Sequence, residues 1–221
     1  MDIVRFDNTE EFVRTSVQWL IGAIIENIDR SGSVVIGLAG GRTPKPVYAL
    51  LATQQRIDWS KVTFFLLDER YVPAEHEDSN QKMIRSTLLN RAAAAKFLAP
   101  NTALPLQECV EKYAQALQKM RADIVVIGMG EDGHIASLFP PLDPLAFGPV
   151  PVLHTTTGQF AGRDRITVTL PILLHASRRL FLILGEKKTA LLQKMQTQNE
   201  DASLYPAQYL FDDRSTWMVG R

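Results

Sequence analysis

Short apolar runs alternate with longer amphipathic segments along the whole chain, and this alternation constrains the fold more than any other feature. The runs expected as buried strands lie at 34–38, 62–67, 124–127, 152–156, 166–170, 180–184 and 217–219. Continuous apolar runs of this length, separated by helical segments, are typical of a parallel sheet buried on both faces. The sequence therefore predicts an α/β fold: a mostly parallel sheet flanked by helices on both faces, with 62–67 as a central strand.

The amphipathic segments predict the helices. Apolar side chains recur every three to four positions between Phe12 and Ile28, with Thr9 as the expected N-cap and Gly32 just past the end. Further helices are expected over 44–54 behind the cap Thr43, over 80–91 behind the cap Ser79, and over 106–121 and 187–196.

Composition limits the classes of protein that fit. The 221 residues carry 24 Lys+Arg and 24 Asp+Glu, which gives no overall attraction to nucleic acid or to an anionic membrane. Cys109 is the only cysteine, so neither an intramolecular disulfide nor a Cys-rich zinc site is expected. The sequence has no repeat, linker, signal-peptide pattern or apolar run of about 18 residues, so we expect one cytoplasmic domain over residues 1–221.

Polar and glycine-rich segments follow three of the expected strands, at 37–44, 68–73 and 128–134. In open parallel sheets, ligands bind outside the carboxyl ends of the strands, and these ends share one edge. We therefore expect the three segments to face one crevice.

The first segment has the character of a phosphate-binding loop. Gly40 and Gly41 let the backbone approach a ligand closely, Arg42 adds a positive charge and Thr43 a hydroxyl. The helix expected from Pro44 directs its positive end at the same loop. The segment matches neither the Walker A loop nor the three-glycine dinucleotide fingerprint. A tight strand-to-helix turn without a ligand is the alternative interpretation.

The second segment places Asp68, Glu69 and Arg70 directly after a buried strand, where charges are unfavourable unless they are paired or functional. Arg70 is suited to an anionic substrate, and Asp68 to orienting a neighbouring base. The alternative is an internal arginine–carboxylate pair that closes the strand end. His76, on the polar loop that follows, has no partner at metal-ligand spacing and is expected at the surface.

The third segment contains the candidate general base, His134, which we expect at the start of a short helix. Asp132 precedes it by two residues, and a carboxylate can fix the tautomer of an imidazole that acts as a base. Gly130 and its neighbours bring backbone donors within reach of a developing oxyanion. The alternatives are a capping histidine or a metal ligand, but no second histidine stands at ligand spacing, so no metal is expected.

No side chain here has the pattern of an activated nucleophile, so water is the expected attacking group. Ser137 is not in a nucleophile elbow, and Cys109 lies within an expected helix. Arg163 and Arg165 either add anion-binding charge or are plain surface residues. The residues alone predict an enzyme that transfers protons at a small phosphorylated metabolite, and they leave hydrolysis and isomerisation both open.

Three motifs, in this order, resemble those of the 6-phosphogluconolactonases. They are Ala-Gly-Gly-Arg-Thr-Pro at 39–44, Asp-Glu-Arg-Tyr-Val-Pro at 68–73 and Gly-Met-Gly-Glu-Asp-Gly-His-Ile-Ala-Ser-Leu-Phe-Pro at 128–140. The third matches the family pattern at every specified position. Segments 78–80, 165–169, 185–188 and 205–207 extend the resemblance over nearly the whole chain.

The resemblance implies hydrolysis of 6-phospho-D-glucono-1,5-lactone, the second step of the oxidative pentose phosphate pathway, without a cofactor. It implies the Rossmann-like fold shared with glucosamine-6-phosphate deaminases and ribose-5-phosphate isomerases. His134 would activate water, with Asp132 as its neighbour. The residues that it implies for binding the phosphate or the sugar acid are Gly40, Gly41, Thr43, Arg70, Asn80, Gly130 and Arg165.

Two departures from the family pattern concern anion binding. Ala39 and Arg42 replace hydroxyl residues of the glycine loop, so that two hydroxyl contacts are lost and one cation is gained. The family often has a Lys-Pro-Pro stretch where this chain has residues 160–164, and Arg163 is the expected substitute for that lysine.

Two other functions are weighed against hydrolysis. Glucosamine-6-phosphate deaminases usually carry Asp-Glu-Tyr in the second motif and continue the third toward Ala-Phe-Asn-Glu-Pro, and both Arg70 and segment 136–140 depart from that pattern. A non-catalytic sugar-phosphate sensor would not need His134 and would usually carry a fused DNA-binding segment. The expected partner is thus a small sugar-phosphate lactone, with no nucleic acid and no membrane; the oligomeric state is left open.

Overall fold

Parallel strands form the central sheet of the molecule, which the computed structural model describes over residues 1–159, 162–197 and 202–220. Within these ranges the sheet has seven strands, β1 (Asp2–Phe6), β2 (Val34–Leu38), β3 (Val62–Leu66), β5 (Lys96–Leu98), β6 (Ile124–Ile127), β9 (Arg178–Leu184) and β10 (Ser215–Gly220). Their order is β1-β10-β9-β6-β2-β3-β5. After β2 the chain adds β3 on one side of the sheet, and after β6 it adds β9 on the other side. Ligands bind at such a switch of direction, at the carboxyl ends of the two strands.

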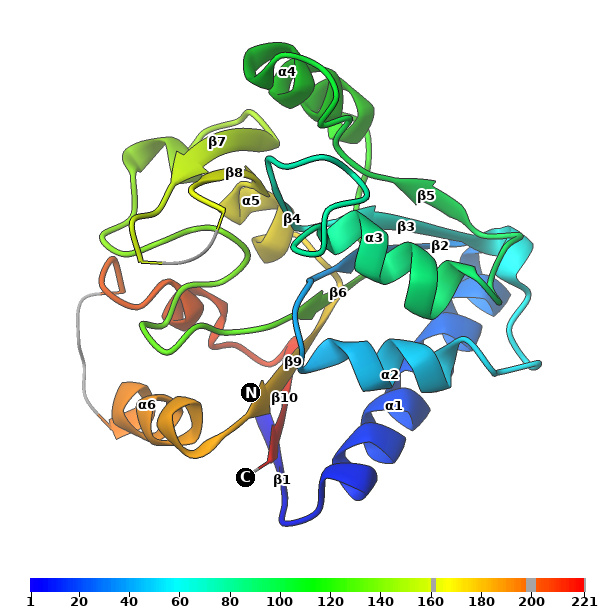
Figure 1. The fold of residues 1–221 in the computed structure, drawn as a ribbon. Helices are drawn as coiled ribbons and strands as arrows, with labels where there is room; N and C mark the ends of the chain where they lie inside the picture. Colours follow the sequence, from blue (N-terminus) through cyan, green and yellow to red (C-terminus); the bar gives the residue numbers. More distant parts are fainter. Residues whose placement is uncertain (160–161, 198–201, 221) are drawn as a thin grey trace.

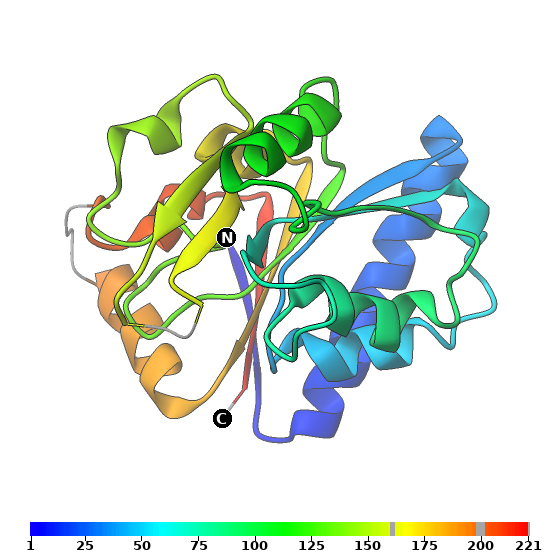
Figure 2. The same cartoon turned by 45° about the horizontal axis from the view of Figure 1, so that its top comes forward.

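Two sets of helices cover the two faces of this sheet (Figure 1). On one face lie α1 (Thr9–Ser31), α2 (Pro44–Leu51) and α3 (Asn80–Ile84), which continues as a π-helical turn over Arg85–Leu89. On the other lie α4 (Leu106–Leu117), α5 (Leu170–Leu174) and α6 (Glu186–Thr197). Short 3-10 turns stand at Trp59–Lys61, Pro144–Phe147 and Pro206–Leu210. Figure 2 shows α1 and α2, in blue, on the side opposite α6, in orange.

Each central strand contributes side chains to two hydrophobic cores, because successive side chains point to opposite faces of the sheet. In β6, Ile124 and Val126 pack on the α1 side, and Val125 and Ile127 pack on the α4 side. All four are fully buried. Truncating an isoleucine at such a position to alanine is expected to cost about 2–5 kcal/mol. The predicted mostly parallel sheet with helices on both faces is therefore confirmed.

A second, antiparallel sheet lies over the α4 side of the molecule. It contains β4 (Asp68–Arg70), β8 (Asp164–Val168) and β7 (Val152–Thr156), in that order. The sequence did not indicate this sheet, and Leu170, expected at the end of a strand, begins α5 instead. In the pairing of β4 with β8, Arg70 lies opposite Arg165.

Two further predictions about individual elements are wrong. The central strand is β6, since β3 has only the short edge strand β5 beyond it. The N-cap of α1 is Asn8, whose side chain accepts a hydrogen bond from the backbone of Glu10, and Thr9 already belongs to the helix. Gly32 does end α1, in the left-handed conformation at φ 78°. Among the described residues, no helix combines the length and apolar character that crossing a membrane requires.

Candidate active site

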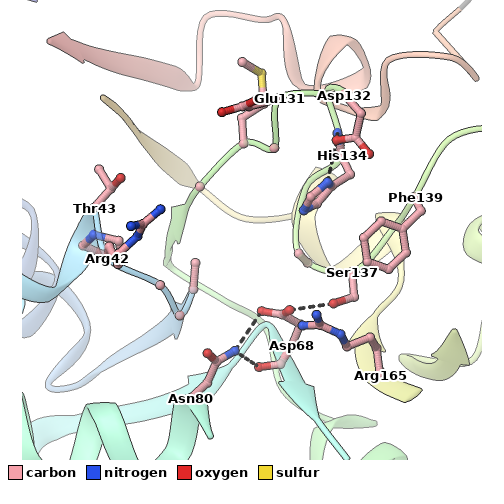
Figure 3. A pocket seen from close by; sticks show the side chains of 18 of the residues that line it. Arg42, Thr43, Asp68, Asn80, Glu131, Asp132, His134, Ser137, Phe139 and Arg165 are labelled. Carbon is pink, nitrogen blue, oxygen red and sulfur yellow. Dashed lines mark hydrogen bonds and ion pairs between the residues drawn. The ribbon is translucent and has the colours of Figure 1, made fainter. Parts of the chain in front are cut away.

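The three segments that follow β2, β3 and β6 meet at one pocket of about 640 Å³, as their positions in the sequence predict. Figure 3 shows Arg42 and Thr43 on one side of it, His134 with Asp132 on another, and Asp68, Asn80 and Arg165 below. The residues that line the pocket are Ala39, Gly40, Gly41, Arg42, Thr43, Pro44, Asp68, Arg70, Asn80, Gly128, Met129, Gly130, Glu131, Asp132, His134, Ala136, Ser137, Phe139, Gln159, Arg165, Leu182 and Lys188.

The glycine loop joins β2 to α2 and forms one wall. Gly41 has a φ of 100°, a conformation that side chains rarely adopt, so the loop needs glycine there. Thr43 stands at the N-cap position of α2, but its hydroxyl makes no capping hydrogen bond. Pro44 and Pro46 lack N–H groups, so the first turn of α2 offers an anion fewer donors than most helices do. An anion at this wall would therefore be bound by the loop backbone and by Arg42.

The opposite wall carries the imidazole of His134 paired with the carboxylate of Asp132. Asp132 Oδ1 lies 2.6 Å from His134 Nδ1 and also accepts a hydrogen bond from the His134 backbone at 3.2 Å. Burial raises the pKa of Asp132, but the hydrogen bonds and charge of His134 outweigh burial and hold this pKa below its usual range. An ionised Asp132 accepts the proton on Nδ1, and this tautomer leaves Nε2 as the basic nitrogen of the neutral ring.

His134 stands in a tight turn, not at the start of a helix as expected. The backbone N–H of Gly130 donates to His134 O at 2.9 Å, and Gly133 donates to Gly130 O at 3.2 Å. A Cβ on Gly130 would overlap the His134 ring and the Asp132 carboxylate. The Phe139 ring packs against the imidazole, with 4.8 Å between ring centroids. This turn and the aromatic ring fix the direction of His134.

The Asp68 carboxylate lies at the floor of the pocket. Its Oδ2 accepts a hydrogen bond from Ser137 Oγ at 2.6 Å, and its Oδ1 accepts one from Asn80 Nδ2 at 3.3 Å. The same Asn80 amide donates to the Asp68 carbonyl at 2.9 Å. The carboxylate in contact with His134 is that of Asp132, as its spacing predicts, whereas Asp68, the other candidate for orienting the base, contacts Ser137 and Asn80.

Among the described residues, hydrogen bonds from neutral groups hold the Glu69 carboxylate, and no arginine side chain pairs with it. Its side chain is fully buried and accepts hydrogen bonds from the Ser79 hydroxyl and from the backbone of Arg70, Asn80 and Gln81. Burial raises the pKa of Glu69, and these donors partly compensate. The internal arginine–carboxylate pair weighed above does not form at Glu69, so Arg70 is directed elsewhere.

Two guanidinium groups from the second sheet line the pocket, those of Arg70 and Arg165. Arg70 donates through Nη1 to the Asp78 carbonyl at 2.5 Å, and its buried Nε has no hydrogen-bond partner among the described residues. Burial lowers the pKa of Arg165 most, and the charge of Arg70 lowers it further. Like charges on facing strands repel each other, and the nearby carboxylates of Asp68, Glu69 and Asp78 act against this effect at Arg165.

Arg163, the expected substitute for the family lysine, does not line the described part of the pocket and is exposed. Phe160 and Ala161 of the same segment lie outside the described residues. The cation that the sequence reasoning left out of the site is Lys188 of α6, which lines the pocket near Arg42. Burial lowers the pKa of Lys188 most, while Glu131 raises it and Arg42 lowers it further. The pattern Gly185-x-x-Lys188 was the signal available for finding it.

The remaining candidates, His76 and Cys109, do not line the described part of the pocket. His76 is exposed, as expected, with its Nδ1 3.7 Å from Asp78. Cys109 is buried in α4, and burial, with the charge of Glu69, raises the pKa of its thiol to about 11. Within the described residues, no group of three or more histidine, cysteine or acidic side chains is arranged to hold a metal ion.

The chain is similar to several 6-phosphogluconolactonases. A probable 6-phosphogluconolactonase of Dictyostelium discoideum is 38% identical over 218 residues, which cover 94% of this chain and 92% of that protein. A 6-phosphogluconolactonase of Synechocystis is 31% identical over 215 residues, covering 92% of this chain and 88% of that protein. The crystal structure of 6-phosphogluconolactonase from Thermotoga maritima matches with a TM-score of 0.90 at 30% identity, covering 100% of this chain and 99% of the other.

The family model for glucosamine-6-phosphate isomerases/6-phosphogluconolactonase matches residues 7–218, nearly the whole chain. The match includes β2, β3 and β6 and the three segments that line the pocket. This chain belongs to the glucosamine-6-phosphate isomerase/6-phosphogluconolactonase family.

Proposed function

We propose that this chain is a 6-phosphogluconolactonase, which hydrolyses 6-phospho-D-glucono-1,5-lactone to 6-phospho-D-gluconate in the oxidative pentose phosphate pathway. The observation that carries the proposal is the 2.6 Å contact between His134 and Asp132 at the wall of a pocket that also holds Arg42, Arg70, Arg165 and Lys188. A base and several cations in one pocket suit a neutral ester linkage on an anionic sugar.

In the reaction, His134 Nε2 accepts a proton from a water molecule as the water oxygen bonds to C1 of the lactone. The negative charge on the C1 oxygen is stabilised by the cations that line the pocket, because the N–H groups of Gly130, Gly133 and His134 already donate within the turn. When the intermediate collapses, the bond between C1 and the ring oxygen breaks, and the imidazolium of His134 returns its proton to that oxygen. Asp132 stabilises the imidazolium between these two transfers. No redox step is involved.

The substrate anion and hydroxyl groups are assigned to the other walls. Figure 3 shows Arg42 and Thr43 on one side of the pocket and Arg165 at its floor. The pocket is also lined by Gly40, Gly41, Arg70 and Lys188. Asp68 and Asn80 present polar groups beside them. We assign Asp68 to the hydroxyl groups of the ligand, because an ionised carboxylate accepts hydrogen bonds but donates none.

We place the protein in the cytoplasm, with a small sugar-phosphate lactone as its partner and with neither nucleic acid nor membrane. The balance of 24 basic and 24 acidic residues supports this proposal, since it gives no general attraction to polyanions.

The test is the rate of lactone consumption, with the lactone made in situ from glucose 6-phosphate and the spontaneous hydrolysis subtracted. We expect the wild-type protein to accelerate hydrolysis and to release no ammonia from glucosamine 6-phosphate. Ammonia release without acceleration of hydrolysis would show a deaminase instead. Binding of sugar phosphates without turnover of either compound would show a sensor.

A further inference from the structure

Ser137 is connected to three elements by hydrogen bonds although it plays no part in the mechanism above. Its side chain is fully buried, yet it borders the pocket. Its hydroxyl donates to Asp68 Oδ2 at 2.6 Å, its backbone N–H donates to Thr167 Oγ1 at 3.1 Å, and its carbonyl accepts from Thr155 Oγ1 at 2.8 Å. The residue therefore joins the turn that carries His134 to β4, β8 and β7.

The backbone beside Ser137 is held in an unfavourable conformation. Ala136 has a φ of 50°, the left-handed region that residues with a Cβ seldom occupy. Such a conformation persists where surrounding contacts determine it. The two backbone hydrogen bonds of Ser137, to Thr167 and from Thr155, supply those contacts on the side of the second sheet.

The hydroxyl of Ser137 has a separate role from its backbone. The Ser137 hydroxyl donates a hydrogen bond to Asp68 Oδ2 at 2.6 Å. With Asn80 Nδ2 on Oδ1, the carboxylate is held from two sides and directed at the pocket (Figure 3). Removing the Ser137 hydroxyl would leave the backbone bonds in place and release only Asp68.

We propose that Ser137 is a positioning residue, whose hydroxyl fixes the Asp68 carboxylate so that it accepts hydrogen bonds from the hydroxyl groups of the sugar-acid ligand. The inference rests on the proposed function for the identity of that ligand. It adds a residue that acts through Asp68 and does not touch the reacting atoms.

The test is a double-mutant cycle on ligand affinity. We expect Ser137→Ala to raise both the KM for the lactone and the Kd for 6-phosphogluconate by at least about fivefold, with a smaller effect on kcat. In an Asp68→Ala background, the same Ser137→Ala change should alter the Kd by less than about twofold, because the group through which Ser137 acts is gone. Calorimetry with 6-phosphogluconate gives the Kd without turnover.

Ser16→Ala is the matched control, because Ser16 is also fully buried and its hydroxyl donates to the Phe12 carbonyl at 2.7 Å, in α1. It should lower stability without changing either constant. An equal effect of Ser137→Ala in the presence and absence of Asp68, or no effect on affinity at all, would overturn the role of Ser137. A wild-type protein that neither hydrolyses the lactone nor binds 6-phosphogluconate would overturn the proposed function and this inference with it.

Discussion

At the scale of single residues, His134 is held by three different kinds of contact. Asp132 Oδ1 contacts the Nδ1 of its ring, the Gly130 N–H donates a hydrogen bond to its backbone carbonyl, and the Phe139 ring packs on the imidazole. These contacts determine where Nε2 points, and a base must lie within hydrogen-bond reach of the proton that it removes. The geometry of this turn is therefore expected to matter for kcat more than for stability.

Gly130→Ala tests that geometry. The added Cβ overlaps the His134 ring, so the imidazole must move, and we expect kcat to fall by about 100-fold. Gly22→Ala in α1 is the matched control, because no atom lies within 4 Å of the Cβ that it adds. Steady-state kinetics should show full activity for Gly22→Ala. Full activity for Gly130→Ala would show that the turn does not set the position of the base.

Arg70 and Arg163 are predicted to behave differently although both are arginines near the second sheet. Arg70→Ala should raise KM by about tenfold or more, since a charge-assisted hydrogen bond to the ligand is lost. Arg163→Ala should leave KM unchanged, because its side chain is exposed and lies outside the described pocket lining. Steady-state kinetics gives the KM of each variant. Equal KM values would contradict the assignment of Arg70 to binding the ligand.

At the scale of elements, the ends of the helices position the site. α2 begins directly after the glycine loop, and α3 begins at Asn80, which reaches Asp68. Ser79 caps α3 as predicted, with its hydroxyl accepting from the backbone of Lys82 at 3.2 Å. Glu69 binds the first backbone N–H groups of the same helix. The start of α2 thus lies at one wall of the pocket and the start of α3 at its floor, while the apolar faces of both helices join the core.

The cap of α1 gives a prediction about stability alone. Asn8→Ala should lower the free energy of unfolding by about 1 kcal/mol, because its side chain accepts from the Glu10 backbone at 2.7 Å. Thr9→Ala should change it by less than about 0.5 kcal/mol, since Thr9 lies inside the helix. Urea unfolding of both variants provides the measurement. A larger loss for Thr9→Ala would assign the cap to Thr9.

Local pattern was enough to predict most of these elements, but not how the second sheet forms. The sequence segments that form β2 and β6 are apolar throughout, and glycines or charged residues lie next to their ends. β4 is only Asp68–Arg70, and its polar residues become a strand because β8 pairs with them. Lys188 and Ser137 enter the site through the packing of α6 and of the second sheet. The pattern Gly185-x-x-Lys188 marks Lys188 in the sequence, but spacing along the chain does not show which residues of other elements these two side chains contact. His134 and Asp132, by contrast, are neighbours in sequence and were predicted.

At the scale of the whole molecule, we infer that residues 1–221 fold as one domain, because both hydrophobic cores share the strands of one sheet. A half-buried ion pair joins β9 to the segment that precedes β10. Arg179, fully buried in β9, binds Asp212, the Ser215 hydroxyl at 2.9 Å and the Leu173 carbonyl at 3.3 Å. Burial raises the pKa of Asp212, but hydrogen bonds from Arg179 and Arg214 outweigh burial and bring it to about 2.

This pair predicts how stability depends on pH. The pKa of Asp212 is lower in the folded than in the unfolded chain, so its stabilisation is complete above about pH 4 and is lost as the pH falls toward 2. Asp212→Asn should lower the free energy of unfolding by about 3 kcal/mol at pH 7, because it leaves the Arg179 charge buried without its carboxylate. The difference from wild type should shrink as the pH approaches 2.

Asp213→Asn is the control for this prediction, since Asp213 is the exposed neighbour. It should change stability by less than about 0.5 kcal/mol at any pH. Denaturant unfolding at several pH values compares the two variants. A difference between wild type and Asp212→Asn that stays constant down to pH 2 would contradict the account of the pair.

The role of His134 as the general base is tested by comparing wild type with His134→Ala in lactone hydrolysis, after subtraction of the spontaneous rate. The account predicts that kcat falls by about 10²–10⁴, the usual contribution of a general base. The affinity for 6-phosphogluconate should persist, because the cations and the glycine loop that bind the anion remain. An unchanged kcat would contradict the account by removing His134 from the mechanism.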